Sequence, residues 1–214
     1  KLTVMTVSLR GINKKFGSEQ AVLHDINLDL GASDFVSLIG PSGCGKSTLL
    51  RIIAGILDSS SGTMSFSDDT QDHQDISFVF QEPTLLPWLT VDTNVQLPLR
   101  MQGVDYQLRS EVSKELLAKV GLVGAAEKYP RQLSGGMKMR VSIARALSVK
   151  PKLLLLDEPF GALDEMTRNN LNEELLRIRS EESWSALFVT HSVAEAVFLS
   201  SRVLVMAANP GRVA

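Results

Sequence analysis

Five short apolar runs recur along the chain and predict β-strands. Several are continuous rather than alternating, which is typical of strands covered on both faces in a parallel α/β sheet. The runs are Phe35 to Ile39, Ile76 to Phe80, Leu153 to Leu156, Ala186 to Thr190 and Val203 to Met206. Two polar segments, Ser59 to Gly62 and Ser67 to Asp75, predict turns in a small β region.

The pattern changes to a helical period between the second and third of these runs. One stripe consists of Leu108, Val112, Leu116 and Val120. A second stripe, Leu171, Leu175 and Ile178, follows Asp164, which is placed to cap it. Both stripes predict ordinary core packing. The sequence therefore indicates a mostly helical segment, about 83 to 150, inserted into an α/β core.

Composition and charge exclude some partners. The 214 residues are 44% hydrophobic and 21% charged, and 22 Lys and Arg against 24 Asp and Glu give a net charge of −2. This balance predicts no nucleic-acid partner and no bulk attraction to anionic lipid. The single cysteine, Cys44, cannot form an internal disulfide. No apolar stretch approaches the roughly 18 residues that span a bilayer, and no signal-peptide pattern is visible at the start.

A glycine-rich turn follows the first apolar run and predicts a phosphate-binding cradle. Gly40 to Ser47 reads GPSGCGKS and fits the pattern G-x-x-x-x-G-K-[ST]. Its glycines allow backbone N–H groups to point at phosphate oxygens, and the predicted helix after it adds its positive end. Lys46 can reach the β- and γ-phosphates, and the Ser47 hydroxyl can bind Mg²⁺. A chance glycine-rich turn is disfavoured by the strand before it and the helix after it. The candidate cradle residues are Gly40, Pro41, Ser42, Gly43, Cys44, Gly45, Lys46, Ser47 and Thr48.

Two acids end the third apolar run. In a phosphate-binding enzyme of this type, the strand-end Asp157 would hold Mg²⁺ directly or through water. Glu158, one residue on, is the candidate that polarises a water for attack on the γ-phosphate. The alternative is a pair of solvated turn acids, with Pro159 ending the strand.

Four further motifs give the chain a family resemblance. Leu133 to Met137 (LSGGM) looks like the ABC signature, Gln81 like the Q-loop, Gly161 to Asp164 like the D-loop and His191 like the switch histidine. Together with the cradle and the acid pair, they resemble the ATP-binding subunits of ABC transporters over essentially the whole chain. The resemblance implies an α/β P-loop NTPase (RecA-like) core with an N-terminal antiparallel β subdomain and an inserted α-helical subdomain. It also implies one domain over 1–214, with the core in about 1–82 and 151–214 and the helical signature subdomain in about 83–150.

The same resemblance implies an ATPase that uses ATP and Mg²⁺. Two copies would close head to tail, so that Ser134 and Gly136 of one copy touch the γ-phosphate held by the other, with Gly135 as a further nucleotide-binding residue. The catalytic residues would be Lys46, Glu158 and His191, and the metal ligands Ser47, Gln81 and Asp157. Asp164 and Phe16 would complete the nucleotide site, Phe16 by stacking on adenine. A structural histidine at 191 and simple core packing of Phe16 are the alternatives.

The chain departs from the family pattern in two places. Met137 stands where a glutamine is common after the signature glycines. Family members also usually carry a further C-terminal stretch beyond the position of Ala214.

The segment Gln81 to Leu89 (QEPTLLPWL) bears on the kind of ABC protein. Its apolar side chains, Leu85, Leu86, Trp88 and Leu89, could bind a partner's helix or could pack against the helical insert. The amino-acid sequence of this segment resembles that of importer cassettes for nitrate, sulfonate, taurine and thiamin precursors. This resemblance implies a small oxyanion, sulfonate or thiamin precursor as cargo. The implied partners are a second copy, transmembrane permease subunits and, indirectly, a periplasmic or lipid-anchored substrate-binding protein.

The implied location is the cytoplasmic face of the inner membrane, peripheral through the permease. A small-molecule kinase would share the cradle but needs no Ser-Gly-Gly signature. A DNA-maintenance ABC ATPase would carry a long coiled coil, and no sustained heptads occur here. The alternative of an exporter or a non-transport ABC protein remains open.

Overall fold

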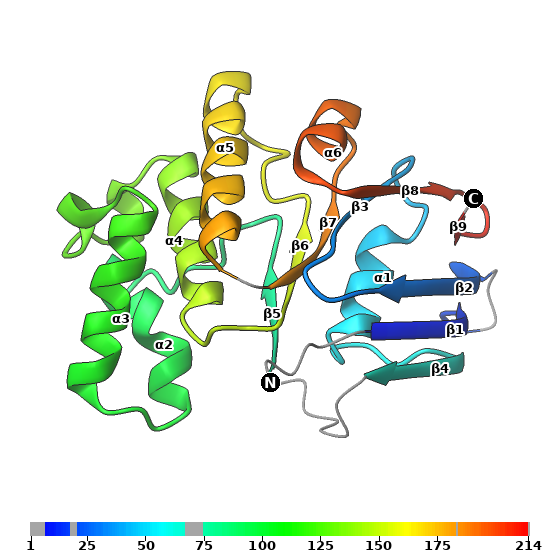
Figure 1. The fold of residues 1–214 in the computed structure, drawn as a ribbon, viewed down its shortest axis with the longest axis horizontal. Coiled ribbons are helices and arrows are strands. Elements are labelled where there is room, and N and C mark those ends of the chain that lie inside the picture. Colours follow the sequence, from blue (N-terminus) through cyan, green and yellow to red (C-terminus); the bar gives the residue numbers. More distant parts are fainter. Residues whose placement is uncertain (1–6, 18–20, 67–74, 183, 214) are drawn as a thin grey trace. The chain divides into compact units, whose positions relative to one another are not determined.

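The computed structural model describes residues 7–17, 21–66, 75–182 and 184–213. The chain forms two compact units (Figure 1). The first comprises residues 1–78, 152–158 and 183–214, and the second comprises residues 79–151 and 159–182. The helical segment expected at about 83 to 150 lies within the second unit, which also contains residues 159–182.

The strands that the structure describes form two sheets. The three-stranded sheet has the order β2-β1-β4 and is antiparallel, with β1 at Val7–Lys14, β2 at Leu23–Leu30 and β4 at Ser61–Phe66. The six-stranded sheet has the order β5-β6-β7-β3-β8-β9. Its strands are β5 (Ile76–Val79), β6 (Leu153–Asp157), β7 (Ser185–Val189), β3 (Phe35–Ile39), β8 (Arg202–Ala207) and β9 (Arg212–Val213).

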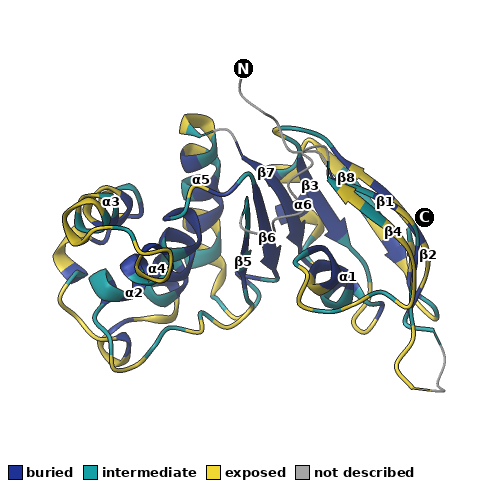
Figure 2. Cartoon of the chain, turned by 90° about the horizontal axis from the view of Figure 1, so that it is seen from below, coloured by how far each residue is buried: buried dark blue, intermediate teal, exposed yellow. Residues whose placement is uncertain are grey.

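All five strands predicted from apolar runs are confirmed to within a few residues at their ends. Strand β3 runs parallel to both β7 and β8, and β6 runs parallel to β7. Every residue of β6 and β7 is buried, as expected for continuous apolar runs, and Figure 2 shows these strands in the colour of buried residues. The carboxyl ends of β3, β6 and β7 therefore meet at one edge of the sheet, which is where the cradle, the acid pair and His191 follow.

The turn predicted at 59–62 is only partly correct. Ser61 and Gly62 already belong to β4, in which Ser61 pairs with Asn13 of β1 beyond a shift in register. The turn predicted at 67–75 lies almost entirely outside the described residues. Strands β1 and β2 were not predicted. Their buried residues join α1 (Lys46–Ile53) and β3 in one hydrophobic core that includes Leu9, Ile26, Leu38, Leu49 and Leu187.

The second unit is helical. It contains α2 (Val91–Met101), α3 (Tyr106–Lys119), α4 (Gly135–Leu147) and α5 (Glu165–Glu181), with 3-10 turns at Val123–Ala125 and Pro130–Gln132. The stripe on α5 is buried as predicted, and Asp164 caps this helix. The core packing predicted for Leu108 on α3 is wrong, since its side chain is 54% exposed. The buried face of α3 is instead formed by Ser113, Leu116 and Leu117.

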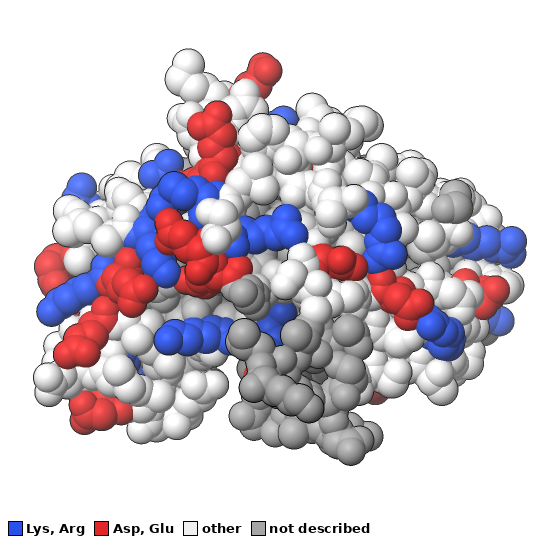
Figure 3. All heavy atoms as spheres, in the orientation of Figure 1, with Lys and Arg blue, Asp and Glu red and all other residues white. Residues whose placement is uncertain are grey.

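Charged side chains of opposite sign alternate over the surface of the helices (Figure 3). Lys119 pairs with Glu115 and Glu182, and Arg177 pairs with Glu181. One further helix, α6 (Val193–Leu199), belongs to the first unit. In the part of the chain that the structure describes, no helix is long and apolar enough to span a bilayer.

Candidate functional site

The predicted phosphate cradle leads from β3 into α1. Gly43 and Gly45 have φ of 78° and 96°, conformations that favour glycine because it lacks a Cβ. The backbone therefore turns back at these two positions before the helix starts at Lys46. The expected sequence of strand, glycine turn and helix is confirmed.

The start of α1 differs from the start of every other α-helix that the structure describes. Helices α2, α3, α4, α5 and α6 each begin with a side chain that accepts a hydrogen bond from a first-turn N–H, namely Thr90, Asp105, Ser134, Asp164 and Ser192. At α1 the N-cap is Gly45, with no side-chain cap. First-turn N–H groups carry the positive end of the helix dipole and need an acceptor. The uncapped start of α1 is therefore suited to a phosphate.

Lys46 is buried, with 5% of its surface exposed. Its ammonium donates to the carbonyls of Gly40 (2.9 Å) and Pro41 (3.1 Å), and lies 3.8 Å from Glu158 Oε1. A buried charge needs partners, and here the cradle itself supplies them. The lysine is thus held inside the loop, where it can neutralise phosphate charge.

Ser47 and Asp157, separated by 110 positions, lie side by side. The Ser47 hydroxyl donates to Asp157 Oδ1 at 2.8 Å. Burial raises the pKa of the Asp157 carboxyl above its ordinary value, a shift that the Ser47 hydrogen bond opposes. A buried carboxylate beside a hydroxyl is a hard oxygen pair of the kind that Mg²⁺ prefers, with phosphate oxygens and water as its other ligands. Ser47 and Asp157 therefore fit the expected metal.

Glu158 lies between Lys46 and His191. His191 Nδ1 is 3.4 Å from Glu158 Oε2, and the side chains of the two residues are 56% and 24% exposed. Glu158 has a φ of 45°, which is uncommon for a residue other than glycine. Its N–H donates to the Val189 carbonyl at 3.0 Å, so β7 holds this strained backbone in place. Glu158 thus lies beside a buried lysine and a histidine on a strained backbone, and its expected role as the base remains a prediction.

His191 is held by residues that the sequence did not single out. The Thr190 hydroxyl donates to the buried Glu195 carboxylate and accepts from the Ser192 N–H at 3.0 Å. Both neighbours of His191 are therefore fixed while its own ring stays exposed. These hydrogen bonds join residues within five positions of one another. The sequence Thr-His-Ser followed by Glu195 could therefore have indicated that the neighbours of His191 are held in place.

Phe16 is 47% exposed, so it is not a core residue and the alternative of core packing fails. The Lys14 ammonium lies 5.0 Å from the centre of its ring. Stacking of Phe16 on adenine remains a prediction.

The signature residues lie at the start of α4. Ser134 Oγ caps this helix by accepting from the Met137 N–H at 3.2 Å. Gly136 is buried against α5, and a Cβ there would lie 2.6 Å from Thr167 Cγ2. The signature glycine therefore permits close approach of α4 to the first turn of α5.

Asp164, the other candidate on this side, caps α5. Its carboxylate accepts from the Thr167 N–H at 3.0 Å and from the Thr167 hydroxyl at 2.7 Å. The N–H bond is the main reason why the pKa of Asp164 lies below its ordinary value. The nucleotide contacts expected of Ser134, Gly135, Gly136 and Asp164 remain predictions.

Gln81 is exposed and belongs to the second unit, so its expected role as a metal ligand remains a prediction. The loop that follows is irregular, as its prolines predicted. Leu85 and Leu86 are half-buried, while Trp88 is 70% exposed and is therefore not a core residue.

Two side chains that the sequence did not reveal hold this loop. The fully buried Asn94 accepts from the Leu86 N–H and donates to the carbonyls of Leu86 and Leu89. Arg145 donates to the carbonyls of Pro83 and Thr84. Loop 83–90 is thus fastened to α2 and α4 while Trp88 faces solvent.

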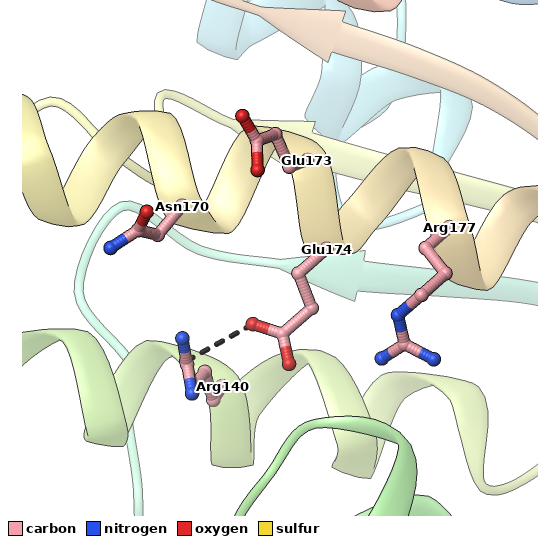
Figure 4. A pocket seen from close by; sticks show the side chains of 5 residues that line it. All are labelled: Arg140, Asn170, Glu173, Glu174 and Arg177. Carbon is pink, nitrogen blue, oxygen red and sulfur yellow. Dashed lines mark ion pairs between the residues drawn. The ribbon is translucent and has the colours of Figure 1, made fainter.

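An open groove lies between α4 and α5 (Figure 4). It is lined by Arg140, Asn170, Glu173, Glu174 and Arg177. Arg140 Nε lies 3.1 Å from Glu174 Oε2, and burial raises the pKa of Glu174. These five residues are distinct from all the predicted site residues.

Comparison with known proteins places the chain in a family. Residues 23–161 match the model described as ABC transporter. An aliphatic sulfonates import ATP-binding protein of Bacillus cereus is 45% identical over 98% of this chain and 84% of its own length. A bicarbonate transport ATP-binding protein of Synechocystis is 47% identical over 96% of this chain and 32% of its own length.

The structure of the ATP-binding cassette MJ0796, described as dimeric, post-hydrolysis and bound to ADP and Pi, has a TM-score of 0.83. It is 34% identical and covers 97% of this chain and 96% of its own. The expected fold class is confirmed. The chain belongs to the ABC transporter family and is an ATP-binding cassette ATPase of that family.

Proposed function

We propose that this chain hydrolyses MgATP to power a bacterial importer, working as a head-to-tail dimer bound to a membrane permease. The observation that carries the proposal is the convergence of Lys46, Ser47, Asp157, Glu158 and His191 around the uncapped start of α1.

The proposed chemistry follows from these positions. The first-turn N–H groups of α1 and the Lys46 ammonium bind the phosphates, and Ser47 and Asp157 hold Mg²⁺ when it enters with the nucleotide. Mg²⁺ neutralises phosphate charge. Glu158 accepts a proton from a water whose oxygen attacks the γ-phosphorus, and the bond to the β–γ bridging oxygen breaks to leave ADP and phosphate. His191, 3.4 Å from Glu158, orients the water and the carboxylate.

Dimerisation would complete this site. The dimeric MJ0796 structures support a two-copy assembly. The starts of α4 and α5 in the second unit carry Ser134, Gly135, Gly136 and Asp164, of which only Gly136 is buried. In the dimer these residues would meet the nucleotide of the other copy. Gln81 would add a metal ligand and Phe16 an adenine contact.

The test is Glu158→Gln, which keeps shape and removes the base. We expect nucleotide binding to survive, turnover to fall by about 100- to 10,000-fold, and ATP to trap a dimer detectable by light scattering. A variant that hydrolyses ATP at the wild-type rate would contradict the assignment of Glu158. A trapped variant that stays monomeric at high protein concentration would contradict the dimer.

The permease is proposed to dock on loop 83–90. Its support is an exposed tryptophan on a loop that Asn94 and Arg145 keep ordered. Tryptophan is enriched among the few residues that carry most of the binding energy of interfaces. The subunit would then lie at the cytoplasmic face of the membrane, bound through the permease.

Trp88→Ala tests this docking site and should not affect folding, since the side chain is 70% exposed. We expect normal ATP binding by the isolated subunit but loss of co-purification with the permease. Wild-type assembly and transport by the variant would rule out this loop. Met166→Ala, which removes another exposed apolar side chain, is the matched control.

The proposed cargo is a small oxyanion or sulfonate; a thiamin precursor was also implied by the sequence resemblance. The named relatives support an oxyanion or sulfonate, since their names describe import of aliphatic sulfonates and transport of bicarbonate. A gene deletion should abolish growth on an alkanesulfonate as the only sulfur source while growth on sulfate continues. Unchanged growth would remove sulfonates from the proposal and leave bicarbonate uptake as the next assay.

A further inference from the structure

The back of the phosphate cradle is closed by a turn near the end of the chain. Strand β8 lies beside β3, the strand that leads into the cradle, with Ile39 opposite Val205. After β8 the chain turns and Gly211 reaches the start of β2. The Gly211 N–H donates to the Val22 carbonyl, and its carbonyl accepts from the His24 N–H, both at 2.9 Å.

This contact leaves no room for a side chain at position 211. A Cβ on Gly211 would lie 2.1 Å from the Cys44 carbonyl oxygen and 2.9 Å from that of Val22. Ordinary contacts between heavy atoms are about 3.5 Å or longer. Both neighbours are backbone atoms, so they cannot rotate away as the end of a flexible side chain can. The cradle and the turn behind it therefore touch directly.

Gly211 requires glycine for space alone. Its φ lies outside the left-handed region, unlike those of Gly43 and Gly45 within the cradle. Alanine could adopt the same backbone conformation, so its cost would fall on steric contacts, of which the one with the Cys44 carbonyl at 2.1 Å is the shortest.

The Cys44 carbonyl and the Gly45 N–H belong to one planar peptide unit. In a trans peptide the N–H points away from the carbonyl, so a push on the Cys44 carbonyl from behind also rotates the Gly45 N–H on the opposite side. A Cβ on Gly45 would lie 2.6 Å from Leu23 Cδ2 and 3.3 Å from the Val22 carbonyl oxygen, so the start of β2 packs against both Gly45 and Gly211. Leu23 is itself bridged to Gly211.

We propose that Gly211 is a positioning residue for the bound phosphates. It allows the β8–β9 turn to support the Cys44–Gly45 peptide from behind and so sets the direction of a phosphate-binding N–H. This inference rests on the proposed ATP site in the cradle.

Gly211→Ala tests it. We expect the dissociation constant for MgADP, measured by calorimetry, to rise at least tenfold, and KM for ATP to rise similarly. The turnover number at saturating ATP should stay within about threefold, because Lys46, Glu158 and His191 keep their own contacts. The matched control is Gly124→Ala, since Gly124 faces open space outside the left-handed region. Its binding and thermal unfolding midpoint should equal those of the wild type.

The outcomes separate the inference from the proposed function. A wild-type protein that fails to bind MgADP contradicts the function itself. A wild-type protein that binds, together with a folded Gly211→Ala variant that binds within twofold, overturns the inference alone.

Hydrogen exchange on the wild type decides the matter if the variant does not fold. MgADP should protect the amides of Gly211 and His24 together with those of the cradle. Protection of the cradle amides with no change at Gly211 and His24 would overturn the inference.

Discussion

Glycines stand at the starts of both α1 and α4, yet the first-turn N–H groups of the two helices have different partners. At α1 the cap position holds Gly45, with no side-chain acceptor, whereas at α4 the Ser134 hydroxyl already accepts from Met137. A side-chain cap stabilises a helix by about 1 kcal/mol, so its absence at α1 costs stability. The N–H groups of α1 can then bind an anion without first breaking an internal bond.

The difference suggests two kinds of phosphate contact in one chain. The cradle would bind nucleotide in a single copy, since Lys46 already lies inside it. Ser134, in the signature, already caps α4, and its contact with nucleotide would form only when a second copy binds. The following predictions test this contrast, from the largest expected effect to the smallest.

Lys46→Ala should weaken ATP binding on the order of 100-fold, about 3 kcal/mol, because it removes a buried charge that faces the phosphates. Calorimetry with MgATP measures it. Lys152→Ala, which removes a half-exposed lysine paired with Asp75, is the control and should bind normally. Binding by Lys46→Ala within threefold of the wild type would mean that the uncapped helix start alone holds the nucleotide.

Asp157→Asn should stabilise the nucleotide-free protein by about 1 kcal/mol while weakening Mg²⁺-dependent hydrolysis, a trade-off common at functional sites. Burial raises the pKa of this carboxyl from 3.8, so its contribution to folding is present below 3.8 and is lost as the pH rises through the raised value. The amide avoids this loss and still accepts from Ser47. Denaturant unfolding at pH 7, with and without Mg²⁺, measures both effects. A destabilised apo variant would show that the carboxylate is structural.

Ser134 variants separate capping from nucleotide contact. Ser134→Ala should lose about 1 kcal/mol of stability, whereas Ser134→Asp should keep it, since aspartate also caps helices. In the Glu158→Gln background, Ser134→Asp should nonetheless abolish the ATP-dependent dimer, because its carboxylate would repel the γ-phosphate. If Ser134→Asp in this background dimerises as well as Glu158→Gln alone, Ser134 acts only as a helix cap.

Asp164→Asn should have the smallest effect. Hydrogen bonds from Thr167 lower the pKa of Asp164, so its stabilising contribution is present above 3.8 and is lost as the pH falls through the lowered value. Asparagine keeps the cap but does not titrate. The variant should therefore lose slightly less stability than the wild type on acidification below 3.8, measured by thermal unfolding. If the unfolding temperatures of the variant and the wild type fall equally on acidification, the cap does not depend on the charge of Asp164.

The sequence by itself determined the features whose chemistry lies in consecutive residues. The cradle, the acid pair at the end of β6 and the Asp164 cap could all be predicted, because each uses neighbours along the chain. The strands of the parallel sheet could also be predicted, since strands buried on both faces read as continuous apolar runs. Strands β1 and β2 could not, because their pairing includes shifts in register that interrupt the alternating pattern.

Only the tertiary structure decided which distant residues support these motifs. The contact of Gly211 with Cys44, and the bonds from Asn94 and Arg145 to loop 83–90, join segments that have no common pattern in one sequence. The same holds for the direction in which an apolar side chain faces: Trp88 and Leu108 are as hydrophobic as any core residue, yet both are exposed. Hydrophobicity states a preference for burial, but packing against particular neighbours decides whether burial occurs.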